Sequence, residues 1–186
     1  MRRIIVGVSG ASGSAYGLAM LRALHATPDL ETHLVLSRQA PTTIALEMPG
    51  TSATDFETLA DVVHRESDLA ASISSGSFRT DGMVVIPCSI KTASSIAYSF
   101  NDNLIARAAD VCLKERRRLI LVVRETPLHL GHLRTLTQLA EIGAVILPPI
   151  PGMYARPTSI DDILNHTVGK VLDHLDISNE LFTRWK

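Results

Sequence analysis

Short apolar runs alternate along this chain with longer segments in which apolar residues recur at helical spacing. The runs that predict strands lie at 3–9, 32–37, 82–88, 118–125 and 143–149. The helical segments lie at 14–26, 39–46, 104–117, 133–143 and 159–175. Strands that alternate with helices form parallel sheets covered by helices on both faces. The sequence therefore predicts a three-layer, Rossmann-like (flavodoxin-like) α/β fold with an open, mostly parallel sheet.

The stretch 48–81 does not follow this alternation. Its segment "SISSGSFRTDG" is rich in Ser and Gly and has neither helical nor strand periodicity. The pattern is compatible with an ordered loop or short crossover, and equally with a mobile segment.

The composition is typical of a compact globular protein, with 46% apolar and 20% charged residues in a chain of 186. We expect one domain over residues 1–186. The formal net charge of −1 gives no reason to expect nucleic acid or a membrane as a partner. Cys88 and Cys112 form no CxxC pair, so neither a disulfide framework nor a zinc cluster is predicted. No apolar stretch is long enough to cross a bilayer, and the cytoplasm is the expected compartment.

Polar and small residues follow each predicted strand at the point where it ends. Ligands of open α/β sheets bind beyond the carboxyl ends of the strands, so these residues should share one edge. They are the turn 10–13, Ser37 and Arg38, the turn 88–92, Arg124 and Glu125, and the segment 148–154.

Two of these turns have alternative interpretations. The glycine turn 10–13 leaves backbone N–H groups free at a helix start, where an anion can dock, or it serves only tight strand-to-helix packing. Ser89 and Thr92 either bind a flavin or phosphate, or simply cap the next helix. Cys88 is expected to be a small buried hydrophobic residue without a catalytic role.

The charged candidates are also ambiguous. Arg107 and Lys114 are seven residues apart, on one helical face, and either grip a phosphate jointly or belong to a solvated face. Glu125, next to Arg124, is either a proton acceptor or half of a structural ion pair. The "HLGH" motif at 129–132 has helical spacing but no third ligand nearby, so we predict no metal site.

Together, the motifs "GVSGASGSAYG", "ETHLVLS", "SISSGSFRTDGMVVIPCSIKT", "RAADVCLKERR", "VVRETPLHLGHL" and "GAVILPPIPGMY" make the chain resemble the UbiX family of bacterial flavin prenyltransferases nearly end to end. The resemblance implies a metal-independent enzyme that joins the dimethylallyl group of dimethylallyl monophosphate to N5 and C6 of reduced FMN. The products would be phosphate and prenylated FMN, the cofactor of UbiD-type decarboxylases, with ubiquinone biosynthesis as the expected context. It also implies a homododecamer with FMN sites between subunits. In that case Phe182 and Trp185 would pack on a neighbour, although they could equally dock on their own subunit.

The resemblance also implies residue roles. FMN would be bound by Gly10, Ala11, Ser12, Ser37, Ser89, Ile90, Lys91, Thr92 and Arg124. The substrate phosphate would be bound by Arg107, Lys114, Glu125, Tyr154 and Lys170, and the catalytic residues would be Ser12, Glu125 and Lys114.

One position departs from the family pattern, because Lys170 stands where arginine is usual. Lysine keeps the charge but loses the planar fork. Two other activities remain as alternatives: an FMN-dependent oxidative decarboxylase acting on a peptidyl cysteine, and a non-catalytic flavin carrier.

Overall fold

The computed structural model describes residues 1–185, which contain one six-stranded sheet. The strands are β1 (Arg2–Val8), β2 (Leu30–Leu36), β3 (Val62–Arg65), β4 (Gly82–Cys88), β5 (Arg118–Val123) and β6 (Val145–Ile146). All neighbouring strands pair in parallel, in the order β3-β2-β1-β4-β5-β6. This is the strand order of doubly wound Rossmann sheets. The predicted fold class is confirmed, and the sheet is parallel throughout.

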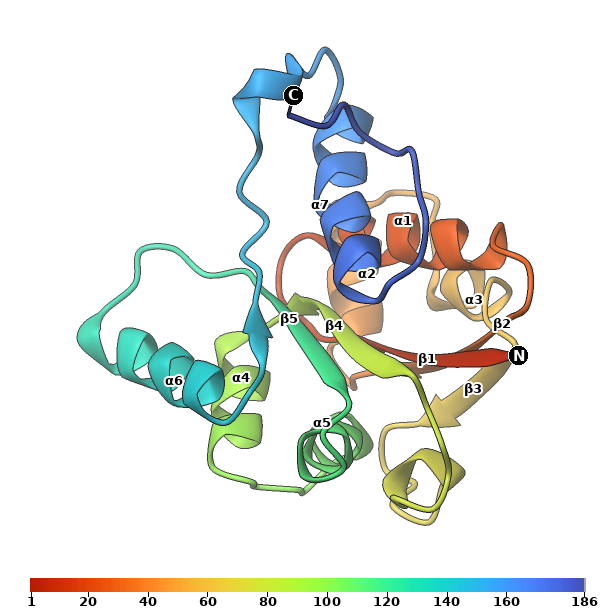
Figure 1. The fold of residues 1–186 in the computed structure, drawn as a ribbon, viewed down its shortest axis with the longest axis vertical. Helices are drawn as coiled ribbons and strands as arrows, with labels where there is room; N and C mark the ends of the chain where they lie inside the picture. The colour runs from red at the N-terminus through yellow and green to blue at the C-terminus, as the bar shows by residue number, and fades with distance from the viewer. Residues whose placement is uncertain (186) are drawn as a thin grey trace.

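Helices cover both faces of the sheet, as Figure 1 shows. One face carries α1 (Ser14–His25), α2 (Ala40–Glu47), α3 (Ala53–Glu57) and α7 (Ile160–His174). The other carries α4 (Ile90–Ala97), α5 (Leu104–Lys114) and α6 (Leu130–Glu141). Two 3₁₀ turns, η1 (Ser72–Ser74) and η2 (Met153–Ala155), complete the elements.

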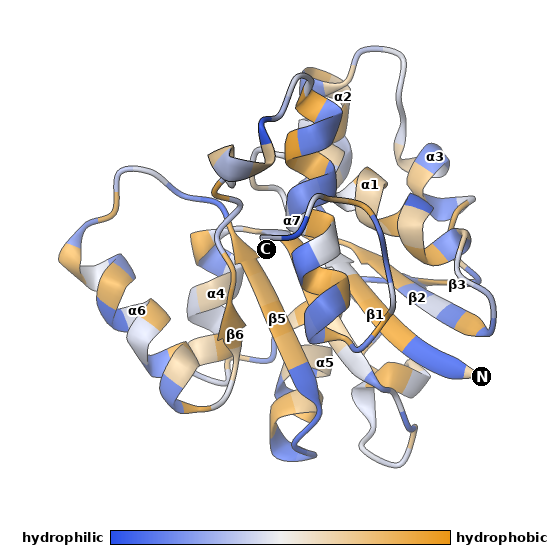
Figure 2. Cartoon of the chain, turned by 45° about the horizontal axis from the view of Figure 1, so that its top comes forward, coloured by the Kyte–Doolittle hydropathy of each residue, from blue (hydrophilic) through white to orange (hydrophobic). Residues whose placement is uncertain are grey.

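The alternation of side chains along the strands divides the core into two layers. In β1, Ile4 and Val6 belong to the layer under α1 and α7, whereas Ile5 belongs to the layer under α5. Every residue of β4 is buried, as expected for a central strand covered on both faces. Figure 2 shows the resulting apolar strands between helices with mixed faces.

The structure differs from the sequence prediction mainly in the stretch 48–81. It contains α3, β3 and η1, and β3 extends the sheet beyond β2. Arg117 ties the segment after η1 to the end of α5, because its guanidinium donates to the carbonyl oxygens of Gly76 (2.6 Å) and Phe78 (2.8 Å). The stretch is therefore built as an ordered crossover.

Three smaller differences concern element ends. Helix α4 was not among the predicted helices, although a helix start at Ser89 was one interpretation of that turn. The last predicted strand shrinks to two residues, since Pro148 and Pro149 follow it and proline cannot donate to a ladder. Helix α6 begins at Leu130, three residues early, because the His129 imidazole caps it. No helix within residues 1–185 is long and apolar enough to span a membrane.

Candidate functional site

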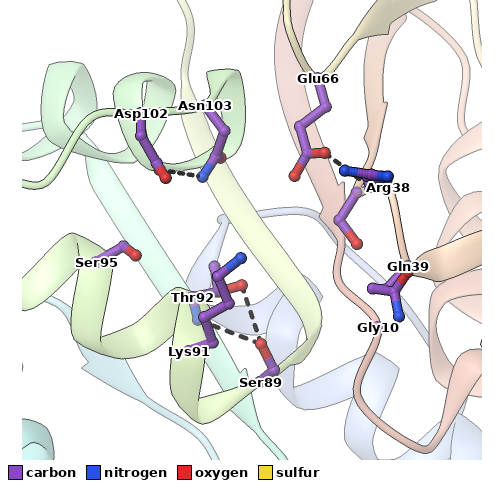
Figure 3. Close-up of a pocket in the computed structure, with 11 residues that line it drawn as sticks. Gly10, Arg38, Gln39, Glu66, Ser89, Lys91, Thr92, Ser95, Asp102 and Asn103 are labelled. Atoms are coloured by element: carbon purple, nitrogen blue, oxygen red, sulfur yellow. Dashed lines mark hydrogen bonds between the residues drawn. The ribbon is translucent and has the colours of Figure 1, made fainter.

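A polar cleft of about 520 Å³ opens at the carboxyl ends of β1, β2 and β4. This is the edge at which the sequence places the ligand site, next to the position where the winding of the sheet reverses. Figure 3 shows the cleft between the start of α4 and the segments that follow β1, β2 and β3. Its lining residues are Gly10, Ser37, Arg38, Gln39, Glu66, Ser89, Lys91, Thr92, Ser95, Asp102 and Asn103.

Gly10 is required at one wall of this cleft. A Cβ atom added to Gly10 would lie 2.5 Å from the Cβ of Gln39, far inside van der Waals contact. The turn after β1 can therefore approach the start of α2 only without a side chain. The small residues of this turn are therefore needed for packing, and they also leave the backbone open at the cleft.

The opposite wall is held by a chain of hydroxyl hydrogen bonds. The buried Ser9 hydroxyl donates to the carbonyl oxygen of Pro87 (2.7 Å) and accepts from the Ser89 backbone N–H (2.8 Å). The Ser89 hydroxyl in turn accepts from the backbone N–H of Thr92 (3.2 Å) and lies 3.0 Å from the Thr92 hydroxyl. Ser89 is thus an N-cap of α4, which confirms that interpretation; because it also lines the cleft, flavin or phosphate binding at this turn stays a prediction.

Ser37 supplies the clearest sign that the cleft suits a polar ligand atom. Its hydroxyl oxygen is buried and has no hydrogen-bond partner in the described structure, although the residue lines the cleft. A buried hydroxyl without a partner carries a desolvation cost of about 1–3 kcal/mol that a ligand atom can remove. Together with the N-terminus of α4 and Lys91, this donor set suits the phosphate and polar edge of a flavin nucleotide.

Sequence reasoning missed part of the cleft. Glu66, which follows β3, accepts a hydrogen bond from the Arg38 backbone N–H (2.7 Å), but β3 itself was not predicted. Asn103 caps α5 by accepting from the Ala106 backbone N–H (3.0 Å). An asparagine directly before a helical run is an N-cap signal that could have located this residue.

The helix start at residues 12–14 is occupied by a carboxylate of the same chain. Glu47 accepts from the backbone N–H groups of Gly13 (2.9 Å) and Ser14 (2.8 Å). Burial raises the pKa of Glu47, but these hydrogen bonds outweigh it and leave the pKa below its usual value. The anion-docking position expected at this turn is therefore filled by Glu47, a residue that sequence reasoning did not select.

The predicted phosphate-binding pair lies on one face of α5, against the segment around η1. Arg107 donates to the Ser74 carbonyl oxygen (3.1 Å) and to Asp110 (3.0 Å). Lys114 donates to Glu115 (2.6 Å) beside Gly76. The shared face is confirmed, and each cation is paired with an acidic residue of its own helix or helix end.

Arg124 and Glu125 follow β5 at the carboxyl edge of the sheet. The Arg124 backbone N–H donates to the carbonyl oxygen of Cys88 (3.0 Å), while its side chain is exposed. Glu125 accepts from the Thr126 backbone N–H (3.0 Å). The two side chains form no ion pair within residues 1–185, so the structural ion pair considered from the sequence is not present there.

Tyr154 lies on η2 and Lys170 on α7, the helix that packs beside α1 on one face of the sheet (Figure 1). The Tyr154 hydroxyl lies 3.3 Å from Nε2 of His166, and its ring meets the edge of Trp185 at 5.2 Å. Lys170 pairs with Asp173 at 3.7 Å. Within this chain Trp185 packs on Tyr154 and Phe182 on His166, but Trp185 stays 77% exposed, so packing on a neighbouring subunit stays a prediction.

One chain does not gather all the predicted residues. The cleft brings together Gly10, Ser37, Ser89, Lys91 and Thr92; Ala11, Ser12, Ile90 and Arg124 adjoin it in sequence or at the same sheet edge. Lys114 ends α5 before β5, whereas Glu125 follows β5. A strand of six residues, roughly 20 Å long, therefore separates the edges on which they lie.

Two motifs have structural explanations. Nδ1 of His129 accepts from the backbone N–H groups of Gly131 (3.0 Å) and His132 (3.4 Å), so the histidine acts as a helix cap. No cluster of three or more His, Cys, Asp or Glu suited to a metal occurs within residues 1–185. Burial raises the pKa of Cys88 and of Cys112 to about 12, which fits inert core thiols.

The comparisons with known proteins agree along the whole chain. A family model described as Flavoprotein matches residues 1–172. Flavin prenyltransferase UbiX of Escherichia coli (strain K12) is 58% identical over 188 residues, covering 100% of this chain and 99% of that protein. The crystal structure of AnUbiX in complex with FMN and dimethylallyl pyrophosphate has a TM-score of 0.96 at 48% identity, covering 100% of this chain and 97% of that one. A dodecameric FMN-dependent UbiX-like decarboxylase from Escherichia coli O157:H7 has a TM-score of 0.96 at 49% identity, covering 99% of both chains.

Proposed function

The chain belongs to the flavoprotein family and, within it, to the UbiX flavin prenyltransferases, and from this premise we propose its reaction. It transfers the dimethylallyl group of dimethylallyl monophosphate to reduced FMN, with release of phosphate and formation of prenylated FMN. The recipient of the product is a UbiD-type decarboxylase, and the reaction takes place in the cytoplasm. The observation that carries the proposal is the polar cleft, with its unpartnered Ser37 hydroxyl, in a chain that matches this family from end to end.

The residues of the cleft hold and orient the flavin. Reduced FMN supplies the nucleophilic positions N5 and C6 to which the prenyl group is attached. Ser37, Ser89 and Thr92 offer hydroxyls to its polar groups, and the open backbone at Gly10 permits close approach. Fixing the flavin in this way replaces a bimolecular encounter with an oriented one, which lowers the entropic part of the barrier.

In this proposal Ser12 handles a proton beside the cleft. Glu47 binds the backbone N–H groups of Gly13 and Ser14 and so fixes the turn that carries Ser12, whose hydroxyl can pass a proton to or from a neighbouring group. Glu125 is the second proton acceptor in the proposal, and the departing phosphate is an alternative to it.

The substrate phosphate is bound by Arg107, Lys114, Tyr154 and Lys170, which are not gathered within one chain. We propose that neighbouring subunits of a homododecamer bring them to the flavin edge, in line with the dodecameric relative. The cations stabilise the negative charge that develops on the leaving phosphate as the C–O bond breaks. The AnUbiX complex contains a pyrophosphate ester, so the donor is tested with both esters.

The direct test is anaerobic incubation of the purified protein with reduced FMN and each ester, followed by mass spectrometry of the extracted flavin. A gain of one C5H8 unit, dependent on the ester, is expected. Unmodified FMN from flavin-loaded protein would favour the carrier, and carbon dioxide release from a peptidyl cysteine would favour the oxidative decarboxylase.

Lys170→Arg tests the departure from the family pattern. Arginine offers a bidentate fork in place of a point charge, so the Michaelis constant for the prenyl phosphate should fall about three- to tenfold while kcat changes less. An unchanged Michaelis constant would remove Lys170 from the phosphate site.

A further inference from the structure

A histidine on α7 contacts the hydroxyl of Tyr154. Nε2 of His166 lies 3.3 Å from the Tyr154 hydroxyl oxygen, and the two rings meet edge to face at 5.8 Å between centroids. His166 is four residues before Lys170 on the same helix, so the two side chains lie on one face. Neither the family roles nor the polar cleft accounts for this contact.

The surroundings of His166 hold its ring in place. A Cβ atom added to Gly152 would lie 2.6 Å from Nε2 of His166 and 3.0 Å from the Tyr154 ring, so the histidine packs directly on the Gly152 backbone. The Phe182 ring closes the other side at 4.9 Å. A ring held between three neighbours keeps Nε2 directed at the phenol.

We propose that His166 is a positioning residue that determines whether the Tyr154 hydroxyl donates its proton to the substrate phosphate. The inference rests on the proposed placement of Tyr154 and Lys170 at that phosphate. A phenol has one proton, and a phosphate dianion only accepts hydrogen bonds. When Nε2 is unprotonated, it takes the phenol proton and turns the oxygen lone pairs toward the anion.

Protonation of Nε2 reverses the direction of this hydrogen bond. Nε2–H donates to the Tyr154 oxygen, which frees the phenol proton for the phosphate. The imidazolium has this proton at all times, whereas the neutral ring has it only in one of its two tautomers. Phosphate binding is therefore coupled to the protonation of His166, and affinity should weaken as the ring loses its charge.

The charged groups near His166 do not supply a competing partner. Tyr154 is the titratable group that faces the ring from η2. On α7, Lys170 and Asp162 lie about one turn away, and Asp162 accepts hydrogen bonds from the backbone N–H groups that start the helix. Beyond Phe182, Arg184 is bound through both nitrogens to Asp173 (3.0 and 2.8 Å). His166 forms no ion pair within residues 1–185.

The experiment measures binding rather than turnover. Dissociation constants for inorganic phosphate and dimethylallyl monophosphate are determined by calorimetry on the full-length protein loaded with oxidised FMN, from pH 6 to pH 8. Trp185, the single tryptophan, touches the Tyr154 ring and gives an independent fluorescence signal. The variants are His166→Gln, Tyr154→Phe and the double variant. Glutamine is polar like histidine, and its amide group can still donate a hydrogen bond to the Tyr154 oxygen, but it does not titrate.

The ratio of the wild-type to the His166→Gln dissociation constant removes the titration of the phosphate itself, which both proteins share. This ratio should rise about three- to tenfold between pH 6 and pH 8. The rise corresponds to the loss of one charge-assisted hydrogen bond, part of which the neutral tautomer with a proton on Nε2 restores. In the Tyr154→Phe background the ratio should be flat.

Two results would overturn the inference, and only the second would also contradict the proposed phosphate site at Tyr154. A flat ratio, with Tyr154→Phe still weakening phosphate binding, refutes the role of His166 and leaves the phosphate site intact. Phosphate binding that is unaffected by Tyr154→Phe at every pH refutes the placement of Tyr154, and the inference with it.

Discussion

Helix α1 has no side-chain cap of its own, and its N-terminus depends on a residue 33 positions away. The residue before α1 is Gly13, and the two free backbone N–H groups of Gly13 and Ser14 donate to Glu47, at 2.9 and 2.8 Å. A carboxylate in this position acts both as a cap and as a counter-charge to the helix dipole. Replacing Glu47 should therefore destabilise α1 and loosen the turn before it.

The magnitude follows from these two contributions. Loss of a side-chain cap costs about 0.5–2 kcal/mol, and an exposed charge at a helix N-terminus contributes about 0.3–1 kcal/mol. Glu47→Gln keeps an acceptor oxygen but loses the charge, so about 0.5–1 kcal/mol is expected. Glu47→Ala loses both, so about 1–2 kcal/mol is expected after allowing for exposure of the side chain. For a chain of this length that corresponds to a thermal midpoint about 1–4 °C and about 2–8 °C lower, respectively.

The pH dependence gives a second, sharper test. The folded pKa of Glu47 lies below its unfolded value of about 4.5, so the charge contributes stability above that value. The contribution is lost as the pH falls through the folded pKa. The difference in midpoint between wild type and Glu47→Gln should therefore be full at pH 7 and shrink below about pH 4.5.

The assay is thermal unfolding followed by circular dichroism at one fixed protein concentration, because oligomerisation makes the midpoint depend on concentration. Glu141→Gln serves as the matched control, since the Glu141 side chain is exposed and makes no hydrogen bond or ion pair within residues 1–185. A midpoint for Glu47→Gln equal to that of the control at pH 7 would refute the capping argument. A difference that widens toward acid would refute the sign of the linkage.

Other changes test the cleft, the core and the phosphate site. Gly10→Ala should abolish FMN retention, because the new Cβ would lie 2.5 Å from the Cβ of Gln39 at the start of α2. Retention is measured by flavin absorbance after gel filtration. Cys88 and Cys112, whose pKa values burial raises to about 12, should resist iodoacetamide in the native protein at pH 8 and yield two adducts after denaturation; a native adduct on either would contradict their burial. Glu115→Gln frees Lys114 from its 2.6 Å ion pair and should lower the Michaelis constant for either ester about two- to fivefold, whereas an unchanged constant would place Lys114 outside the phosphate site.

Much of the fold follows from the spacing of apolar residues along the sequence. The strands β4 and β5 are almost continuous apolar runs, which is the pattern of strands buried on both faces, and β1 and β2 end in apolar runs. The exception is β3, an edge strand with the sequence "VVHR" in which only alternate residues are partly buried. Its four residues are too few and too polar to stand out from a loop, so β3 was not predicted, although an ordered crossover was one interpretation of the stretch 48–81.

The cleft was predictable as far as it depends on strand ends. Gly10, Ser37 and Ser89 were placed by the rule that ligands bind beyond the carboxyl ends of parallel strands. Glu47 and His166 could not be found in that way, because each acts through a contact between segments distant in sequence. Glu47 reaches a helix that begins 33 residues earlier, and His166 meets a phenol on a 3₁₀ turn. Spacing within one helix carries no information about such contacts.

The proposed phosphate ligands share an electrostatic arrangement that bears on how the site operates. Each of the three cations lies near an acidic residue close to it in sequence: Arg107 near Asp110, Lys114 near Glu115, and Lys170 near Asp173, which it shares with Arg184. Three uncompensated cations brought together would repel one another, and pairing lowers that cost before substrate arrives. Because these pairs are partly exposed, each contributes little stability, so a phosphate dianion that gives stronger charge-assisted hydrogen bonds can displace the carboxylates. In the proposed site between subunits, we therefore expect these ion pairs to open when the substrate phosphate binds.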